Sequence, residues 1–152
     1  MIDQLQTVFA SFQKNEVKYV VIGGIAAVLY GVPRATFDLD VLIEPSKENA
    51  QRLLDALAQV GFGTARMTSA EQIVETEITI FADFLRIDVQ TSTPGLTFED
   101  AWRRRVTMTY EGQEFQVVSL ADLIESKTAA GREVDREDVK TLTVERESDS
   151  EG

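Results

Sequence analysis

Residues 17–43, VKYVVIGGIAAVLYGVPRATFDLDVLI, decide the fold. The run 17–22 is rich in strand-forming residues and stops at Gly23-Gly24, which predicts a short strand followed by a turn. Residues 25–30 have helical character, and the glycine and proline that follow predict an early helix end. From Phe37 the apolar residues recur with period two, which predicts a second strand over residues 37–43.

The chemistry of this stretch is that of a phosphate and metal site. Two glycines after a strand let a ligand approach the backbone, because no Cβ stands in the way. The helix after them directs its free N–H groups at the same place, which suits a phosphate. Asp38 and Asp40 project from one face of the next strand and can hold a divalent cation with oxygen ligands alone. A lone D-x-D or a lone Gly-Gly is common, so the combination at this spacing carries the hypothesis.

A third carboxylate is expected on a separate strand, residues 84–90. Asp88 alternates there with apolar neighbours, so it shares the period-two pattern of the first two aspartates. Three such carboxylates can complete a two-metal site for phosphoryl or nucleotidyl transfer. Asp83 is an alternative third carboxylate, but it falls at the predicted turn between two strands, where Asp is common for local reasons.

Composition narrows the class of site. The chain has no Cys and no His, which excludes Ser-His-Asp and Cys-His catalysis, disulfides, and zinc sites built on those residues. Oxygen ligands favour Mg²⁺, Mn²⁺ or Ca²⁺. The formal net charge of −11 disfavours non-specific binding to DNA or to anionic membranes. No signal peptide is visible, and the longest low-polarity run, 19–32, is shorter than the about 18 residues that a membrane span needs. We expect a cytoplasmic protein that does not enter a membrane.

The rest of the chain predicts a small α/β (α+β) domain. We expect a mixed sheet with helices packed mainly on one face, and the carboxylates on the open side. The predicted domain covers residues 1–143, and residues 144–152 are predicted to form a disordered acidic tail. Further expected elements are helices over 2–12, 46–60, 98–105, 119–131 and 135–142, strands over 73–81 and 84–90, and a hairpin of 106–110 with 115–118. Ser46 and Ser119 are expected to be N-caps, and Gly61 and Gly131 C-terminal caps.

The motifs resemble those of a known group of proteins. The strand–Gly-Gly turn, the R-x-T-x-D-h-D of residues 34–40 and the later h-D-h strand are similar to the nucleotidyltransferase superfamily related to DNA polymerase β. The stretch 23–43 is most similar to small bacterial and archaeal members, including AbiEii-like abortive-infection toxins. Residues 119–142, SLADLIESKTAAGREVDREDVKTL, resemble that branch too, through a Lys-containing helix, an Arg and an Asp-x-x-Asp turn. The resemblance covers residues 17–142.

This resemblance implies a role for each matching residue. Asp38 and Asp40 match metal ligands shared with the nucleotide phosphates, and Asp88 matches the carboxylate that helps deprotonate the acceptor hydroxyl. The implied cofactor is Mg²⁺ or Mn²⁺, and all three aspartates are implied metal ligands. The implied nucleotide-binding residues are Gly23 and Gly24 of the phosphate turn, Lys127, and Arg34 and Thr36 just before the aspartates.

Simpler interpretations stand beside these roles. Arg34 is equally well explained as a surface charge or the partner of an acid, and Thr36 as a structural residue. Lys127 is also explained by an amphipathic helix along which its stem lies. The charged residues after it, Arg132, Asp135 and Asp138, fit helix capping and ion pairs. The chain departs from many active relatives in having Gly-Gly in place of Gly-Ser, and we do not expect their additional C-terminal domain within these residues.

Three hypotheses for function follow. The leading one is a metal-dependent enzyme that moves a nucleoside monophosphate from an NTP to a hydroxyl of an RNA, a protein or a small molecule, as part of a toxin–antitoxin system with a cognate partner protein. The alternative is a non-catalytic binding partner or regulator with the same fold. The third is an ordinary acidic α/β domain with a fortuitous D-x-D.

Overall fold

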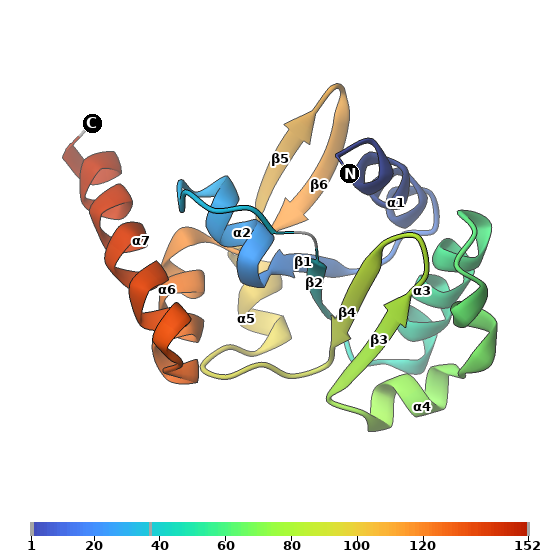
Figure 1. Cartoon of the computed structure of the whole chain (residues 1–152). Helices are drawn as coiled ribbons and strands as arrows, with labels where there is room; N and C mark the ends of the chain where they lie inside the picture. Colours follow the sequence, from blue (N-terminus) through green and yellow to red (C-terminus); the bar gives the residue numbers. More distant parts are fainter. Residues whose placement is uncertain (1, 37, 152) are drawn as a thin grey trace.

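The computed structural model describes residues 2–36 and 38–151, and it has a six-stranded mixed sheet with seven α-helices. This confirms the predicted fold class (Figure 1). Met1, Phe37 and Gly152, which the sequence places in the first domain, at the start of the second strand and in the tail, lie outside the described residues.

The chain begins with alternating helices and strands and continues with two β-hairpins and a C-terminal pair of helices. The strands are β1 (Tyr19–Ile22), β2 (Asp38–Ile43), β3 (Ile78–Ala82), β4 (Arg86–Gln90), β5 (Val106–Tyr110) and β6 (Gln113–Val117). The helices are α1 (Ile2–Lys14), α2 (Gly23–Leu29), α3 (Lys47–Gln59), α4 (Ala70–Glu75), α5 (Phe98–Arg103), α6 (Leu120–Ala130) and α7 (Glu133–Glu151), with a 3₁₀ helix, η1, at Gly63–Met67. The hairpin predicted for residues 106–110 and 115–118 is present as β5 and β6, and its turn residues, Glu111 and Gly112, both have the positive φ that a tight hairpin turn requires.

The sheet has the strand order β3-β4-β2-β1-β6-β5. Its centre is the antiparallel pair of β1 and β2, and the two hairpins β3–β4 and β5–β6 extend it on either side. Each hairpin joins the central pair through a parallel contact, β4 to β2 and β6 to β1. Two strands that are far apart in sequence, β2 and β4, therefore lie side by side and bring their aspartates onto one sheet.

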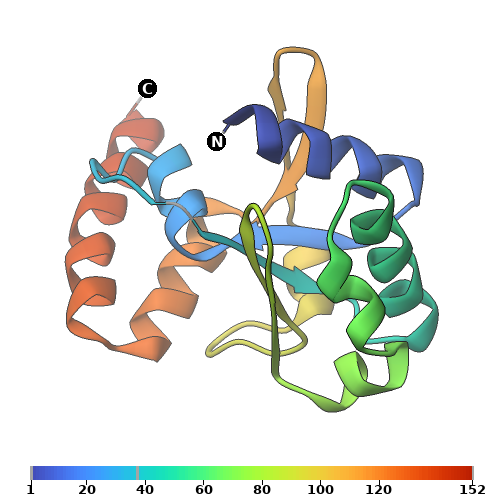
Figure 2. The same ribbon diagram turned by 45° about the vertical axis from the view of Figure 1, so that its right-hand side comes forward.

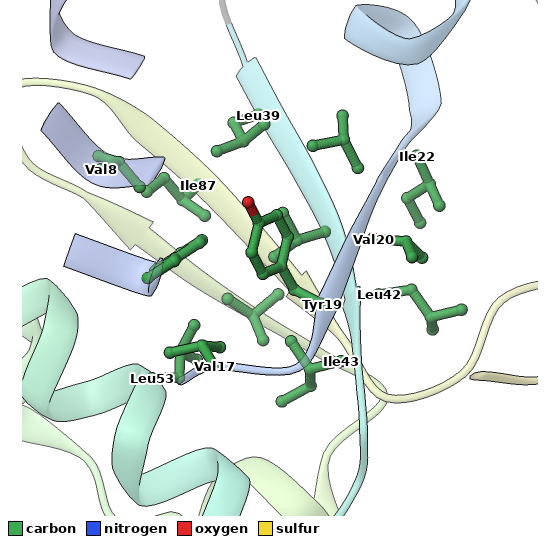
Figure 3. Close-up of a cluster of buried hydrophobic side chains, with 14 of the residues drawn as sticks. Val8, Val17, Tyr19, Val20, Ile22, Leu39, Leu42, Ile43, Leu53 and Ile87 are labelled. Atoms are coloured by element: carbon green, nitrogen blue, oxygen red, sulfur yellow. The ribbon is translucent and has the colours of Figure 1, made fainter. Parts of the chain in front are cut away.

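The hydrophobic core fixes which face of the sheet is buried. Tyr19 lies opposite Ile43 in the register of β1 and β2, and both are buried beneath α1 and α3 (Figure 3). The ring of Tyr19 packs at 4.8 Å, centroid to centroid, from that of Phe12 on α1. Leu39 and Val41 of β2 are fully buried as well. Because side chains alternate along a strand, Asp38 and Asp40 of β2 point to the opposite face.

Local sequence signals fix most helix ends. The side chains of Ser46 and Ser119 accept hydrogen bonds from the backbone N–H groups of Asn49 and Asp122, as expected of N-caps. Gly131 has a φ of 66° and caps α6 in the left-handed conformation. The predicted caps are therefore confirmed at these positions.

The prediction of a strand from residue 73 is wrong, because residues 73–75 belong to α4 and β3 begins only at Ile78. Ile73 and Val74 are β-branched and favour a strand locally. The Ser69 side chain accepts a hydrogen bond from the N–H of Gln72 at 3.3 Å, which starts the helix, and Ile73 is fully buried where α4 meets α3. Capping and tertiary packing override the local preference.

The last helix is longer than predicted. The structure has α7 from Glu133 to Glu151, whereas the sequence predicts a helix over 135–142 and a disordered tail after it. No Gly or Pro interrupts this polar segment, and Glu and Arg are good helix formers. α7 packs against α6, and this pair lies with α2 on the other side of β1 and β2 from α3 and α4 (Figures 1 and 2). None of the helices in the described part of the chain is both long and apolar enough to cross a membrane.

Candidate active site

Three carboxylates lie on one face of the sheet. β2 and β4 are parallel neighbours, and Asp40 is the register partner of Asp88. Asp38 lies two residues before Asp40 on the same face of β2, opposite the core. We call these three residues, with the Arg86 described below, the carboxylate face. The structure thus brings Asp38, Asp40 and Asp88 together, as the resemblance implies.

Like charges at this face change the protonation of Asp40. Burial, followed by the charges of Asp88 and Asp38, raises the pKa of Asp40 to about 6, against the opposing influence of Arg86 and Lys127. An ionised carboxylate with few positive charges nearby is stabilised when it binds a proton or a cation. The geometry therefore favours cation binding at Asp40.

Arg86 is a member of this face that the sequence argument missed. It is the register partner of Asp38 and lies two residues before Asp88 on β4. Its Nε and Nη2 donate to the two carboxylate oxygens of Asp88 at 2.9 and 3.2 Å, and its Nε lies 3.9 Å from Asp38 Oδ2. The signal was present in the sequence, because Arg86 and Asp88 alternate onto the same face of one strand.

The donor set suits a hard divalent cation. Three carboxylates supply only oxygen ligands, which Mg²⁺ and Mn²⁺ accept. Within residues 2–36 and 38–151, no three acidic side chains are placed so that they could hold a metal ion together without moving. Arg86 donates to both oxygens of Asp88, and 46% of its side chain is exposed to solvent. The residues present fit a cation once this guanidinium moves.

Gly23 sets the position of Asp40. It has a φ of +71°, a conformation that L side chains rarely adopt, and a Cβ built on it would lie 2.9 Å from Asp40 Cγ and closer still to Oδ2. The carboxylate of Asp40 therefore rests directly against the backbone at the start of α2. Any larger residue at position 23 would displace it.

Gly24 lies close to side chains of the loop that precedes the aspartates. A Cβ on Gly24 would lie 3.1 Å from Thr36 Oγ1 and 3.3 Å from Arg34 Nη2. Ile22, at the N-cap of α2, offers no side-chain hydrogen bond, and the first turn of the helix carries no acidic residue. The turn thus combines uncapped N–H groups with a hydroxyl and a guanidinium, and such a combination can bind a phosphate.

A buried charge cluster adjoins this turn. Lys127 Nζ lies 2.9 Å from Asp138 Oδ2 and 3.5 Å from Asp135 Oδ1. Arg34 donates to Asp138 Oδ1 at 2.7 Å, and Arg132 donates to both carboxylate oxygens of Asp135 at 2.7 and 3.1 Å. We call these five residues the lysine cluster. It joins the loop before β2 to α6 and α7.

The lysine cluster supplies the ion-pair partners of Lys127 and of Arg34. Lys127 is buried and ion-paired, so its charge does not reach out along an amphipathic surface. Arg34 pairs with Asp138 rather than with an aspartate of β2. Asp138 Oδ2 has no well-directed hydrogen bond in the described part of the chain, so its contact with Lys127 is an ion pair only.

The positive charges around the buried Asp135 lower the pKa of its carboxyl group. Burial raises the pKa of Asp135, but the hydrogen bonds and charge of Arg132, with the charge of Lys127, lower it by more, and the pKa falls below its ordinary value. The cluster also acts on the carboxylate face, because Lys127 lowers the pKa of Asp40 and Asp40 raises that of Arg132. The two groups of charges are electrostatic neighbours.

Asp83, the alternative third carboxylate, has a local role. It lies in the turn between β3 and β4 and accepts hydrogen bonds from the hydroxyl and the backbone N–H of Thr64 at 2.6 and 3.3 Å. These bonds tie the turn to η1. Asp88, and not Asp83, faces Asp40.

A glycine turn, a short helix, a strand with two aspartates and a parallel strand with a third define the nucleotidyltransferase class of fold. The chain belongs to the family described as "Nucleotidyltransferase of unknown function (DUF6036)", whose profile matches residues 2–151. A search of curated proteins gives no significant sequence match.

Solved structures agree with this class. A candidate nucleotidyltransferase from Thermotoga maritima is similar with a TM-score of 0.63 and 18% identity, over 95% of this chain and 92% of that one. An antigenic nucleotidyltransferase-like protein from Paracoccidioides brasiliensis is similar with a TM-score of 0.55 and 17% identity, over 92% and 75% of the two chains. At these identities the likeness shows the fold.

Proposed function

We propose that the protein transfers a nucleoside monophosphate from an NTP to a hydroxyl group of an acceptor, with Asp38, Asp40 and Asp88 holding Mg²⁺ or Mn²⁺. The observation that carries the proposal is that these carboxylates share one face of the sheet beside the glycine turn, with the pKa of Asp40 raised to about 6 by burial and by its acidic neighbours. A cluster of like charges is costly for a fold that gains nothing from it.

The reaction assigns a task to each side chain. The acceptor oxygen forms a bond to the α-phosphorus of the NTP, the α–β phosphoanhydride bond breaks, and pyrophosphate leaves. Asp88 accepts the proton of the acceptor hydroxyl. The bound cation supplies positive charge that offsets the charge developing on the phosphates. The N–H groups of the Gly23-Gly24 turn, with Thr36 and Arg34, bind the phosphate chain, and the net positive lysine cluster adds attraction.

Arg86 has to leave Asp88 for this arrangement to form. Its ion pairs with Asp88 and Asp38 are partly exposed, and such pairs contribute only about 0–1 kcal/mol. A divalent cation replaces one positive charge by two at the same carboxylates. Arg86 therefore acts as a stand-in cation that keeps the empty face from self-repulsion.

Transfer of label from each α-³²P-labelled NTP into an extract of the source cell tests the proposal, with Mg²⁺ or Mn²⁺ present. We expect a labelled product with the wild type and none with Asp38→Ala/Asp40→Ala. Asp83→Ala is the matched control, because it removes a carboxylate from the adjacent turn and leaves the site intact. Equal label from wild type and the double variant would refute the assignment of these aspartates.

A second candidate function is a non-catalytic partner with this fold. The observation that favours it is Arg86, which neutralises the third carboxylate without a metal. This function predicts a stable complex with a partner protein and no label transfer with any NTP. An Arg86→Gln variant separates the two functions: a catalytic site retains Mg²⁺-dependent NTP binding in that variant, whereas a site stabilised by Arg86 alone loses stability and binds nothing.

The resemblance to AbiEii-like toxins supports one further part of the proposal, a role in a toxin–antitoxin pair. Induction of the wild type without its partner is then expected to arrest growth. The Asp38→Ala/Asp40→Ala variant is expected to leave growth unchanged at the same protein level. Growth arrest by both would separate the toxic effect from nucleotidyl transfer.

A further inference from the structure

The carboxylate face continues into an exposed apolar strip on β3. Ile80 is the register partner of Asp88 and Ile78 that of Gln90, so both isoleucines lie on the face of the three carboxylates. Their exposed fractions are 51% and 48%, and Ala82, also on this face, is exposed too. Large apolar residues in the next strand face the core instead, as the full burial of Ile87 shows. The exposed strip therefore lies directly beside the carboxylate that is to receive the acceptor's proton.

β3 is also an edge of the sheet (Figure 1). It is the outermost strand on its side, and within the described ranges no further strand pairs with it. An edge strand offers unpaired N–H and C=O groups, and proteins usually protect such edges with Lys or Pro. The sequence of β3, ITIFA, contains neither. This edge is open to the addition of another strand.

The charges around the strip select among acceptors. Glu77 precedes β3 and Asp83 follows it, and both are exposed. Arg86 is a single cation on this face, paired with Asp88 and Asp38 in the ligand-free protein, and one guanidinium is not a basic cluster whether or not it stays paired. A polyphosphate backbone needs clustered Lys and Arg and would be repelled here. An extended polypeptide with apolar side chains at alternate positions and basic residues at its flanks is complementary to the strip.

We infer that β3 binds an extended segment of a protein acceptor as an added strand, and that the nucleotide is transferred to a tyrosine of that segment. The inference rests on the proposed function and names its acceptor class. Neighbouring strands are about 4.8 Å apart, so an added strand would lie about 10 Å from β4. A serine or threonine is too short for that span. A tyrosine ring can lie over Ile80 and bring its hydroxyl to Asp88.

The chemical step is balanced by the groups present. The phenolic oxygen forms a bond to the α-phosphorus while the bond to the pyrophosphate oxygen breaks. The phenolic proton passes to Asp88. The product is a phosphodiester between tyrosine and the nucleoside.

The test uses label transfer from α-³²P-labelled NTP and Mg²⁺ to proteins of the source-cell extract, with Ile78→Ser/Ile80→Ser compared with wild type. We expect label that resists ribonuclease, is released by protease and maps to tyrosine by mass spectrometry. We expect the double variant to label at least about tenfold less, as loss of one well-made apolar docking contact predicts. Val144→Ser, at an apolar position on α7 that is 60% exposed, is the matched control and should label as wild type does.

Thermal stabilisation and label transfer together distinguish failure of this inference from failure of the proposed function. Thermal stabilisation by Mg²⁺ and NTP should be equal in all these proteins, since the strip is not part of the nucleotide site. If the double variant does not fold, Ile80→Thr keeps the β-branched shape, and the same loss of label is expected. Label that ribonuclease removes, label on serine or threonine, or undiminished label in the folded variants would overturn the inference and leave nucleotidyl transfer standing. No label from the wild type itself would instead overturn the proposed function, and this inference with it.

Discussion

The carboxylate face and the lysine cluster are built from similar residues and hold opposite charge balances. The first has three carboxylates and one arginine on an accessible sheet surface. The second has three basic residues and two carboxylates, and Lys127, Asp135 and Asp138 within it are buried. The pKa of Asp40 is raised in the first, and that of Asp135 is lowered in the second.

This difference shows what decides the role of a carboxylate. Asp40 is surrounded mainly by like charges, so it gains free energy from a cation that arrives from solvent. Asp135 already has its cations, so it gains nothing from one. The carboxylate face has an excess of negative charge, whereas the paired charges of the lysine cluster join α6, α7 and the loop before β2. Four experiments test this contrast.

Removal of Lys127 is expected to have the largest effect. In Lys127→Met, Asp138 and Asp135 stay buried with less positive charge, and loss of one partner of a buried pair costs about 3–5 kcal/mol of the free energy of unfolding. Urea denaturation measures this. Lys140→Met, which removes the exposed pair with Glu137, is the control and should change stability by less than about 0.5 kcal/mol. A small loss in Lys127→Met would mean that the cluster is not structural.

Neutralisation of Asp40 is not expected to lower the free energy of unfolding, in contrast to removal of Lys127. Asp40→Asn removes a like charge, so the free energy of unfolding of the ligand-free protein should stay equal or rise. Stabilisation by saturating Mg²⁺ and NTP, about 2.7 kcal/mol at a hundred times Kd, should disappear. Thermal unfolding with and without ligand measures both, with Asp83→Asn as the control. Retained stabilisation in Asp40→Asn would remove Asp40 from the metal site.

The two regions should respond to pH with opposite signs. The pKa of Asp40 rises from 3.8 to about 6 on folding, so its protonation stabilises the fold below 3.8, and this contribution is lost as the pH rises through about 6. The pKa of Asp135 falls below 3.8, so its contribution is present above that value and is lost as the pH falls through the lowered pKa.

Unfolding measured against pH for wild type, Asp40→Asn and Asp135→Asn separates the two contributions. From pH 4 to pH 6 the free energy of unfolding of wild type should fall relative to that of Asp40→Asn. As the pH rises from the acid limit, the free energy of unfolding of wild type should rise relative to that of Asp135→Asn. Curves of the same slope for both variants would contradict the contrast.

The smallest effect is expected for Arg86→Gln. Loss of the guanidinium frees both oxygens of Asp88, so Mn²⁺ should bind more tightly by about twofold to fivefold, the range of an exposed ion pair. Titration of Mn²⁺, followed by electron paramagnetic resonance, measures this. Arg103→Gln, which removes an exposed pair with Asp100, is the control. Weaker binding in Arg86→Gln would mean that the arginine helps to build the site.

The regular parts of the fold could be predicted because their signals are local. Period-two alternation defines β2 and β4, and Ser46, Ser119 and Gly131 mark helix ends. α4 was missed because the preference of its β-branched residues points to a strand, while the burial of Ile73 against α3 depends on the complete fold.

Some features of the candidate site also follow from local sequence, and others depend on the complete fold. The shared face of Asp38 and Asp40 follows from strand geometry, but the pairing of Asp40 with Asp88 depends on β2 and β4 becoming neighbours, which no local pattern encodes. The resemblance supplied that link. The partners of Lys127 and Arg34 come from the helical pair α6 and α7, so the sequence could suggest ion pairs for Asp138 and not their geometry.

The ion pair of Arg34 with Asp138 joins residues 104 positions apart. During synthesis the ribosome releases Arg34 and the aspartates of β2 long before it releases α7. A nascent chain that has already paired β1 with β2 therefore lacks the clamp on the loop beside its glycine turn. The loop beside the glycine turn therefore gains this ion pair only after nearly the whole described chain has been translated.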